Sequence, residues 1–303
     1  MRPPTAKPRI RASLESEPQG EGSTSGAPGE PLRGTSEVQA PGPWLLPVGA
    51  LIATLGAVCG IGGGLFSTPI LHYGFGFVLR RAIATSLALV TATALSATTA
   101  EMLRADSAVP LGLVAAIIPA ALFGTQIGYR LGHRLSARVL KGVFSLALTA
   151  VGLKMLLGGG QAAVLVGYAP DLRDQLAAAA LGFGAGLVVP ILGIGGGMLM
   201  VPGMLLLVPE LGYMGARATS LAVASVTATR SAYLYLRAGK LRPEDARWIA
   251  CGAALGAFGG VQLVHLAAVA AGGQVLLAVI LLVSALRFGW DVLRPSQNPP
   301  IGK

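Results

Sequence analysis

Two glycine-rich segments are the places where this chain is best equipped to bind a ligand. "GIGGGLFSTP" begins at Gly60 and "GIGGGMLMVP" begins at Gly193, each within an apolar stretch. Consecutive glycines interrupt a helix, and the helix that resumes beyond them points free backbone N–H groups at the break. Because such a helix N-terminus attracts negative charge, we expect the two breaks to converge on an anion. The residues predicted to hold it are Gly62, Gly63, Gly64 and Pro69 in the first segment and Gly195, Gly196, Gly197 and Pro202 in the second.

Hydroxyl side chains follow each glycine segment, at the start of the next apolar stretch. The string "ATSLA" occurs at 84–88 and again at 218–222. Its threonine and serine can donate hydrogen bonds to an anion, or they can bond the carbonyls of their own helix. The candidate ligands are Thr85, Ser86, Thr219 and Ser220.

Few charged side chains fall inside the apolar stretches. Arg230 does, and an arginine within a membrane is a candidate for function; its alternative role is to extend to the headgroups beside Tyr233 and Tyr235. His72, near the first break, is assigned a structural role. No acidic residue falls convincingly within a span, so the sequence predicts no carboxylate that relays protons.

Catalytic and metal-binding patterns are absent from the sequence. It contains no GxSxG or HExxH motif and no paired acidic residues within a span, so we expect no enzymatic activity. Cys59 and Cys251 lack the spacing of a metal site or a disulfide framework. No cofactor and no metal ion is therefore predicted.

The composition is that of a membrane protein. Of the 303 residues, 53% are hydrophobic and 12% are charged, against about 25% charged in soluble domains, and the mean hydropathy is +0.68. Apolar runs such as 176–209 exceed the roughly 18 residues that cross a bilayer. The net charge of +10 does not indicate nucleic-acid binding, because the basic residues form short clusters between apolar spans.

The chain divides into a tail and two related halves. Residues 1–42 have almost no large apolar side chains and are predicted to be disordered. Motifs then recur at offsets of 132 to 134 residues, which indicates a duplication. Besides the repeated strings, Gly124, Gly128 and His133 match Gly256, Gly260 and His265. The predicted boundaries are 43–157 for the first half, 158–175 for a linker, 176–294 for the second half and 295–303 for a C-terminal tail.

Each half is predicted to hold a glycine-broken helix pair followed by three transmembrane helices. The spans are expected at 82–103, 108–131 and 139–158 in the first half, and at 217–237, 246–267 and 272–290 in the second. Glycines spaced by four residues at 124, 128 and 132, and at 252, 256 and 260, predict close helix packing. Packing is also the alternative role for the glycine breaks.

The basic residues favour an inverted relation between the halves. If each broken segment enters and leaves the membrane by one face, 18 of the 23 Lys and Arg residues share a single face; the exceptions are Arg104, Lys154, Arg173, Arg217 and Arg230. The positive-inside rule makes that face, and the N-terminus, cytoplasmic. The predicted fold class is an all-α, multi-pass membrane protein with two inverted repeats.

The doubled pattern carries a resemblance to a known family. It comprises the glycine segments at 60–71 and 193–207, both "ATSLA" strings and "YLRAGKL" at 235–241. From Trp44 to about Leu293 the chain resembles the sulfite exporter TauE/SafE family, also described as four-toluene sulfonate uptake permeases. The resemblance implies a permease of the bacterial inner membrane for a small sulfur-containing or organic anion, such as sulfite, a sulfonate or sulfoacetate.

The function predicted from these features is secondary transport of that anion by alternating access around the two breaks. Two alternatives stay open at this point: an anion channel on the same scaffold, and a membrane assembly factor that transports nothing. The predicted partners are the small anionic substrate and the lipid bilayer, with no nucleic acid. A coupling proton or ion and a homo-oligomer are both compatible with the sequence.

Overall fold

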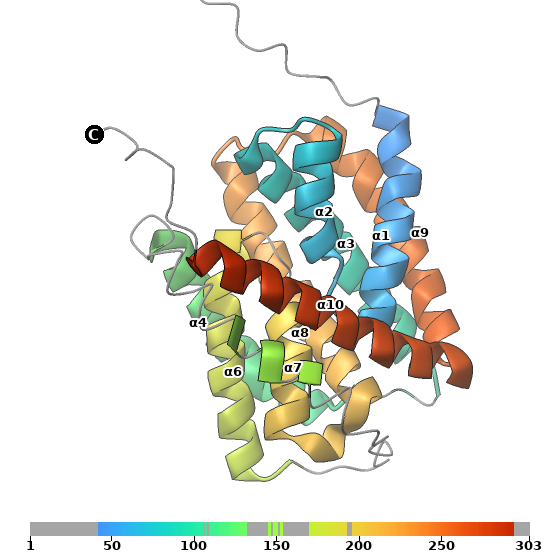
Figure 1. Ribbon diagram of the computed structural model, residues 1–303, viewed down its shortest axis with the longest axis vertical. Helices are drawn as coiled ribbons and strands as arrows, with labels where there is room; N and C mark the ends of the chain where they lie inside the picture. Colours follow the sequence, from blue (N-terminus) through green and yellow to red (C-terminus); the bar gives the residue numbers. More distant parts are fainter. Residues whose placement is uncertain are drawn as a thin grey trace, which may run out of the picture. The chain divides into compact units, whose positions relative to one another are not determined.

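The structure is a bundle of helices (Figure 1). A computed structural model describes residues 42–105, 107, 109–131, 145–146, 148–150, 152–153, 170–192 and 196–293, and the account below concerns these residues. Their elements are η1 (Gly42–Trp44), α1 (Leu45–Cys59), α2 (Gly64–Pro69), η2 (Ile70–Gly74), α3 (Leu79–Met102), α4 (Leu111–Leu131), α6 (Leu172–Leu192), α7 (Gly197–Leu207), η3 (Pro209–Leu211), α8 (Gly212–Arg237), α9 (Pro243–Val264) and α10 (Ala267–Leu293).

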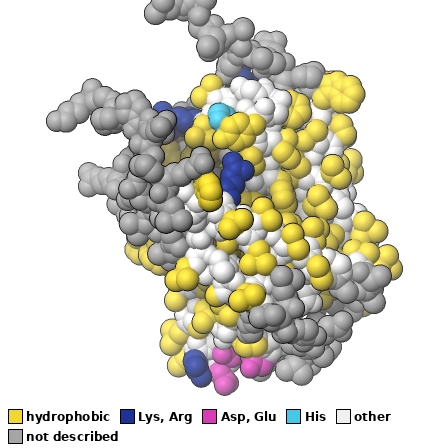
Figure 2. All heavy atoms as spheres, viewed as in Figure 1, with side chains coloured by type: hydrophobic (Ala, Val, Ile, Leu, Met, Phe, Trp, Pro, Cys, Tyr) yellow, Lys and Arg dark blue, Asp and Glu magenta, His cyan; other side chains and the backbone are white. Residues whose placement is uncertain are grey.

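Most of these helices are long and apolar enough to cross a membrane. Among the described residues the candidate spans are Gly42–Cys59, Leu79–Met102, Leu111–Arg130, Leu172–Pro190 and Pro243–Val264. A sixth is the pair Gly197–Leu207 and Pro209–Arg237, which is bent by 108°. Large hydrophobic side chains such as Leu51, Phe123 and Leu286 are exposed on the sides of the bundle, as Figure 2 shows for one face. The predicted all-α membrane class is confirmed.

One expected span differs from the structure, and other expected segments lie outside the described residues. The last predicted span, 272–290, falls within α10, whose apolar part Gly272–Arg287 is shorter than a full span. Figure 1 shows α10 crossing the other helices obliquely. The N-terminal tail to residue 41, most of the linker and much of the predicted span 139–158 lie outside the described residues.

Helix α1 packs against α9 through glycines. A β-carbon at Gly252 or Gly256 of α9 would collide with the carbonyl oxygen of Leu46 or Ala50 in α1. The contacts advance by four residues in both helices, so α1 and α9 run in the same direction. The backbones approach this closely because glycine has no side chain to separate them.

The same arrangement joins α4 to α6. Gly124 and Gly128 of α4 face the carbonyl oxygens of Phe183 and Leu187 in α6, and these two helices also run in the same direction. The prediction that the glycines spaced by four residues form packing faces is confirmed at 124, 128, 252, 256 and 260; residue 132 lies outside the described part of the chain.

Helices α3 and α8 lie between these two pairs, and their contacts set the remaining directions. The start of α3 meets the start of α9 through Arg81 and Asp245. The end of α3 meets the start of α8 through Glu101 and Arg217. Helices α1, α3 and α9 therefore run one way.

Helices α4, α6 and α8 run the opposite way. The rings of Tyr129 and Tyr235 lie 5.9 Å apart, which places the end of α4 beside the end of α8. The Tyr235 hydroxyl donates to the carbonyl of Pro190 near the end of α6. We call the end of the bundle where α1, α3 and α9 start the basic end. Its described Lys and Arg residues are Arg80, Arg81, Arg130, Arg237, Lys240, Arg242 and Arg247, whereas the opposite end has Arg104, Arg173 and Arg217.

The first broken segment leaves the basic end and returns to it. α1 runs for 15 residues from that end, and α3 starts there again. The return limb is short, because α2 has six residues and a π-helical turn of five follows Pro69. Proline has no N–H with which to extend the α-helical ladder. Gly76, at φ 68°, then takes the backbone out of helical geometry before α3 begins.

Candidate functional site

The two glycine breaks touch each other. Gly197, the first residue of α7, lies against the first break so closely that a β-carbon there would collide with the Gly60 carbonyl oxygen and sit 2.7 Å from the Ile61 Cα. The same β-carbon would sit 2.8 Å from the Ser220 Oγ. Segments about 130 residues apart in the sequence thus meet at one point inside the bundle.

The first break is a buried turn of left-handed residues. Gly60, Gly62 and Gly63 have φ angles of 75°, 73° and 80°, which L side chains rarely adopt. The amides of Ile61 and Gly62 both bond the carbonyl of Gly56 and close the end of α1. The glycines therefore serve a backbone conformation that other residues would strain, in addition to close approach.

The serines of both "ATSLA" strings bond the breaks. Ser220 Oγ donates to the Gly60 carbonyl at 2.7 Å, and so links the second half to the first break. Ser86 Oγ lies 2.6 Å from Ser67 Oγ and 3.5 Å from the Gly64 carbonyl. Both serines are fully buried. Both hydroxyls thus contact backbone carbonyls of the first break.

The two threonines of the strings differ from the serines. Thr85 and Thr219 are fully buried, and neither hydroxyl has a hydrogen-bond partner in the described structure. A threonine in a helix ordinarily bonds a carbonyl one turn earlier, as Thr227 does with Val223 at 3.0 Å. An unpaired buried hydroxyl costs about 1–3 kcal/mol. The two threonines that the sequence singles out therefore have unused hydrogen-bonding capacity, and each directly precedes a serine that contacts the first break.

The remaining predicted ligands are placed differently. Pro69 ends α2 and Pro202 is buried inside α7, while Gly195 lies outside the described residues. Arg230 is half-buried; it donates to Gln126 Oε1 at 3.0 Å and lies 5.9 Å from the ring centre of Tyr233. It follows Ser220 by ten residues, or about 15 Å along α8. The structure does not bring Arg230 to the breaks.

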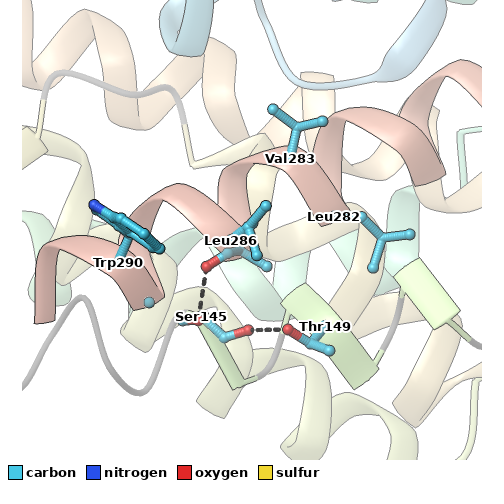
Figure 3. A pocket seen from close by; sticks show the side chains of 8 residues that line it. Ser145, Thr149, Leu282, Val283, Leu286 and Trp290 are labelled. Carbon is cyan, nitrogen blue, oxygen red and sulfur yellow. Dashed lines mark hydrogen bonds between the residues drawn. The ribbon is translucent and has the colours of Figure 1, made fainter. Parts of the chain in front are cut away.

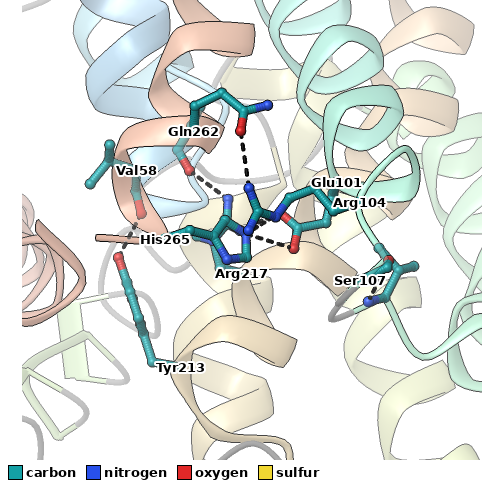
Figure 4. Close-up of polar contacts among 10 residues, drawn as sticks. Val58, Glu101, Arg104, Ser107, Tyr213, Arg217, Gln262 and His265 are labelled. Atoms are coloured by element: carbon teal, nitrogen blue, oxygen red, sulfur yellow. Dashed lines mark hydrogen bonds and ion pairs between the residues drawn. The ribbon is translucent and has the colours of Figure 1, made fainter. Parts of the chain in front are cut away.

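A buried cluster of charged residues lies instead beside the first break (Figure 4). Arg217 Nη2 lies 2.5 Å from Glu101 Oε2, and both side chains are almost completely buried. His265 Nε2 lies 3.1 Å from Glu101 Oε1. Arg217 Nη1 also donates to the Ala57 carbonyl at 3.2 Å, at the end of α1. A β-carbon on Gly60 would sit 2.8 Å from the Arg217 Cγ, so the arginine packs directly on the break.

This cluster was not predicted from the sequence. No functional carboxylate was expected and Arg217 was counted among the exceptions to the charge bias, yet the predicted spans 82–103, 217–237 and 246–267 contain all three residues. Glu101 is the first acidic residue after Glu37. The available signal was that three ionisable side chains sit near span ends that the predicted topology brings to one face.

A second buried ion pair lies at the basic end. Arg81 Nη2 lies 2.6 Å from Asp245 Oδ2, and the guanidinium also stacks 4.3 Å from the ring centre of Phe77. Like the Glu101–Arg217 pair, it joins a residue of the first half to a residue of the second. Both ends of α3 are thus tied to the second half by charge.

A surface cavity of about 470 Å³ lies away from the breaks, between residues 145–149 and α10 (Figure 3). Its lining is apolar apart from the hydroxyls of Ser145 and Thr149. Ser145 donates to the Ala285 carbonyl and Thr149 donates to the Ser145 carbonyl, both at 2.8 Å. Both hydroxyls are therefore already hydrogen-bonded to backbone carbonyls. Among the described residues no group of three His, Cys, Asp or Glu side chains could hold a metal ion.

Comparisons with known proteins identify a family and several related membrane proteins. The sequence profile of the sulfite exporter TauE/SafE family matches residues 12–155 and 178–302. The chain is 36% identical over 137 residues to the probable membrane transporter protein MamO of Paramagnetospirillum magneticum, an alignment that covers 41% of this chain and 21% of that protein. It is 30% identical over 162 residues to a probable membrane transporter protein of Haemophilus influenzae, covering 52% and 59% of the two chains. The chain therefore spans less than two thirds of the curated relatives it matches. No solved structure matches it significantly.

Proposed function

Because the chain belongs to the sulfite exporter TauE/SafE family, we propose that it is a secondary transporter of a small oxyanion such as sulfite, a sulfonate or sulfoacetate. The anion binds where the two glycine breaks meet, and the halves give alternating access to it from the two sides of the cytoplasmic membrane. The observation that carries the proposal is that breaks from both halves touch, while the buried hydroxyls of Thr85 and Thr219 have no hydrogen-bond partner among the described residues. Each threonine directly precedes a serine that contacts the first break.

The geometry supports a carrier more than a channel or an assembly factor. A broken helix inside a membrane leaves backbone groups unpaired, and it is tolerated where it is buried in protein or lines a polar cavity. Here the first break and the described start of α7 are buried and close-packed, which fits an occluded state of a carrier better than an open pore. A factor that only assembles other proteins has no need of unpaired hydroxyls in its interior.

The opposite directions of matching helices support inverted repeats. α1, α3 and α9 run against their counterparts α6, α8 and α4, as an in-plane two-fold axis requires. The clustering of Lys and Arg at the basic end supports a cytoplasmic position for that end and for the N-terminus.

The anion site is tested by removing one unpaired hydroxyl. We expect Thr219→Val to weaken binding of sulfite roughly 10- to 150-fold, because a hydrogen bond to a charged ligand is worth roughly 1.5–3 kcal/mol. The stability of the ligand-free protein should not fall, since valine replaces a hydroxyl that has no partner. Affinity is measured by calorimetry in detergent and stability by thermal unfolding.

Thr227→Val is the matched control for that substitution. Thr227 is buried in the same helix, but its hydroxyl already bonds the Val223 carbonyl. Its loss should leave anion affinity unchanged. Equal losses of anion affinity in the two variants would mean that the effect comes from altered packing of α8 rather than from a lost contact with the ligand. Unchanged affinity in Thr219→Val would show that this hydroxyl does not bind the anion.

The orientation is tested by labelling single cysteines in intact cells. Ala238→Cys lies at the basic end and Arg173→Cys at the opposite end, both exposed, in a background where the exposed Cys251 is replaced by alanine. We expect a membrane-impermeant maleimide to label position 173 directly, and to label position 238 after the cells are permeabilised. Labelling of both positions from the same side would contradict the proposed topology.

A further inference from the structure

The strongest unexplained feature of the molecule is the cluster of Glu101, Arg217 and His265. Two of its members form an ion pair in the protein interior, with side-chain exposures of 2% for Glu101 and 0% for Arg217. Burying such charges is expensive and often adds nothing to stability compared with apolar residues. Because the cluster carries this free-energy cost and lies beside the proposed anion site, we looked to anion binding for its role.

The ion pair of the cluster is absent from the matching positions in the other half, whereas His265 has His133 as its counterpart. Arg217 directly precedes its "ATSLA" string, where the first half has Ile83. Glu101 stands two residues before "LRA", where the second half has Leu234. Packing common to the two halves therefore does not require these charges.

Arg217 is the member placed to meet an anion. It packs on Gly60, and two of its donors bond Glu101 and the Ala57 carbonyl. Its Nε has no hydrogen-bond partner in the described structure although the side chain is fully buried. A guanidinium has five N–H donors in a planar fork that matches an oxyanion. The unpaired Nε–H of Arg217 thus lies beside the break. The N–H groups that bond Glu101 become available to an anion in any state in which the carboxylate moves away.

The charge of the cluster depends on His265. Glu101 and Arg217 cancel, so the cluster is neutral when the imidazole is neutral. A carboxylate can only accept, so in that state His265 Nε2 carries the hydrogen that bonds Glu101, and Nδ1 is the atom that takes up a proton. Protonation makes the cluster a net cation, and an anion that then binds at Arg217 restores neutrality. In a low-dielectric interior the two events favour each other.

We propose that His265 couples anion binding to the uptake of one proton, so that the bound anion and the proton occupy the cluster together. The inference rests on the proposed anion site and names its coupling ion. Among the described residues, the charged groups near the imidazole include Glu101 from α3 and Arg217 from α8. Arg104 bonds Gln262, which lies one turn before His265 in α9. Beyond Arg217, Tyr213 donates to the Val58 carbonyl next to Cys59.

The test counts protons taken up for each anion bound. The probe is methanesulfonate, whose own charge is constant between about pH 5.5 and pH 8.5, the range that brackets histidine titration. Calorimetry in two buffers with different ionisation enthalpies gives the number of protons directly. For the wild-type protein we expect uptake approaching one proton per anion, and about a tenfold loss of affinity for each pH unit above the range where histidine titrates.

Two variants separate the cluster from other sources of pH dependence. His265→Gln keeps a side chain that can bond Glu101 but cannot become charged, so proton uptake should fall to near zero. Glu101→Gln gives Arg217 a neutral partner and imitates the charge of the protonated cluster. It should bind methanesulfonate at least about tenfold more tightly than the wild type at pH ~8.5. His72→Gln is the matched control, because His72 bonds the Phe77 carbonyl near the basic end, and it should keep the wild-type proton count.

The outcomes distinguish this inference from the proposed function. Binding by the wild type without proton uptake, or unchanged uptake in His265→Gln, would overturn the coupling and leave the anion site standing. If His265→Gln does not fold, the number of protons taken up by the wild type and the affinity of Glu101→Gln decide whether anion binding is coupled to the proton. Failure of methanesulfonate, sulfite and sulfoacetate to bind the wild type at either pH would overturn the anion site and the coupling with it.

Discussion

Arg217→Met is expected to lower the free energy of unfolding by about 3–5 kcal/mol, because it leaves Glu101 as a buried carboxylate without its cation. Most of this loss comes from the group that remains rather than from the group removed. The double variant Arg217→Met/Glu101→Leu should therefore recover much of the stability, since it replaces the ion pair by apolar side chains of similar size. Unfolding of the purified protein in detergent measures both effects.

Arg230→Met is the matched control in the same helix. Arg230 is half-buried and bonds the neutral Gln126, so its loss leaves no charge behind and should cost less than about 1 kcal/mol. A double variant at 101 and 217 as unstable as Arg217→Met alone would show that the ion pair itself stabilises the fold. In that case the two charges would need no functional explanation.

Gly197→Ala should abolish transport, because its single added methyl group lies where the two breaks meet. The new β-carbon would collide with the Gly60 carbonyl and approach Ile61 and Ser220 within 3 Å. Two of the obstructing atoms belong to the backbone, which cannot rotate away as a side chain could. Overpacking of this kind costs about 1–3 kcal/mol, and here it forces the breaks apart. Uptake of labelled sulfite into proteoliposomes is the measurement.

Gly184→Ala provides the comparison for that experiment. Gly184 lies in α6, which leads to the second break, and a β-carbon there meets nothing within 4 Å. Alanine is the better helix former by about 1 kcal/mol, so this variant should be at least as stable as the wild type and should transport normally. Wild-type transport by Gly197→Ala would mean that contact between the breaks is incidental.

Local patterns predicted the features that depend on local geometry. Glycines spaced by four residues produced the two close helix pairs, because any helix with that spacing presents a flat strip. Ser86 contacts the first break for a similar reason, because its distance from the glycines is set by one short return limb and the start of α3. Ser220 contacts the same break from the other half of the chain, 160 residues away, and local geometry does not set that contact.

The charged cluster could not be predicted in this way. Glu101 is separated from Arg217 by 116 residues and from His265 by 164, so their meeting depends on how three helix ends pack. The position of Arg230 within an apolar stretch made it the candidate, because a hydropathy pattern shows only where a residue lies along its span. Burial in the folded protein depends instead on which neighbours cover a side chain, and it is Arg217 that they cover completely.

The long sequence separation within the cluster has a consequence for the way the chain enters the membrane during synthesis. Helix α3 leaves the ribosome before Arg217 and His265 have been made, so Glu101 is inserted without either partner. Glu101 lies one residue before the end of α3, so its carboxylate can stay among the lipid headgroups at a small free-energy cost. We expect the side chain to become buried once α8 and α9 have been inserted. The first half made alone should therefore insert, yet keep Glu101 in contact with water, so that final burial is a late, post-insertion step of biogenesis that depends on the C-terminal half.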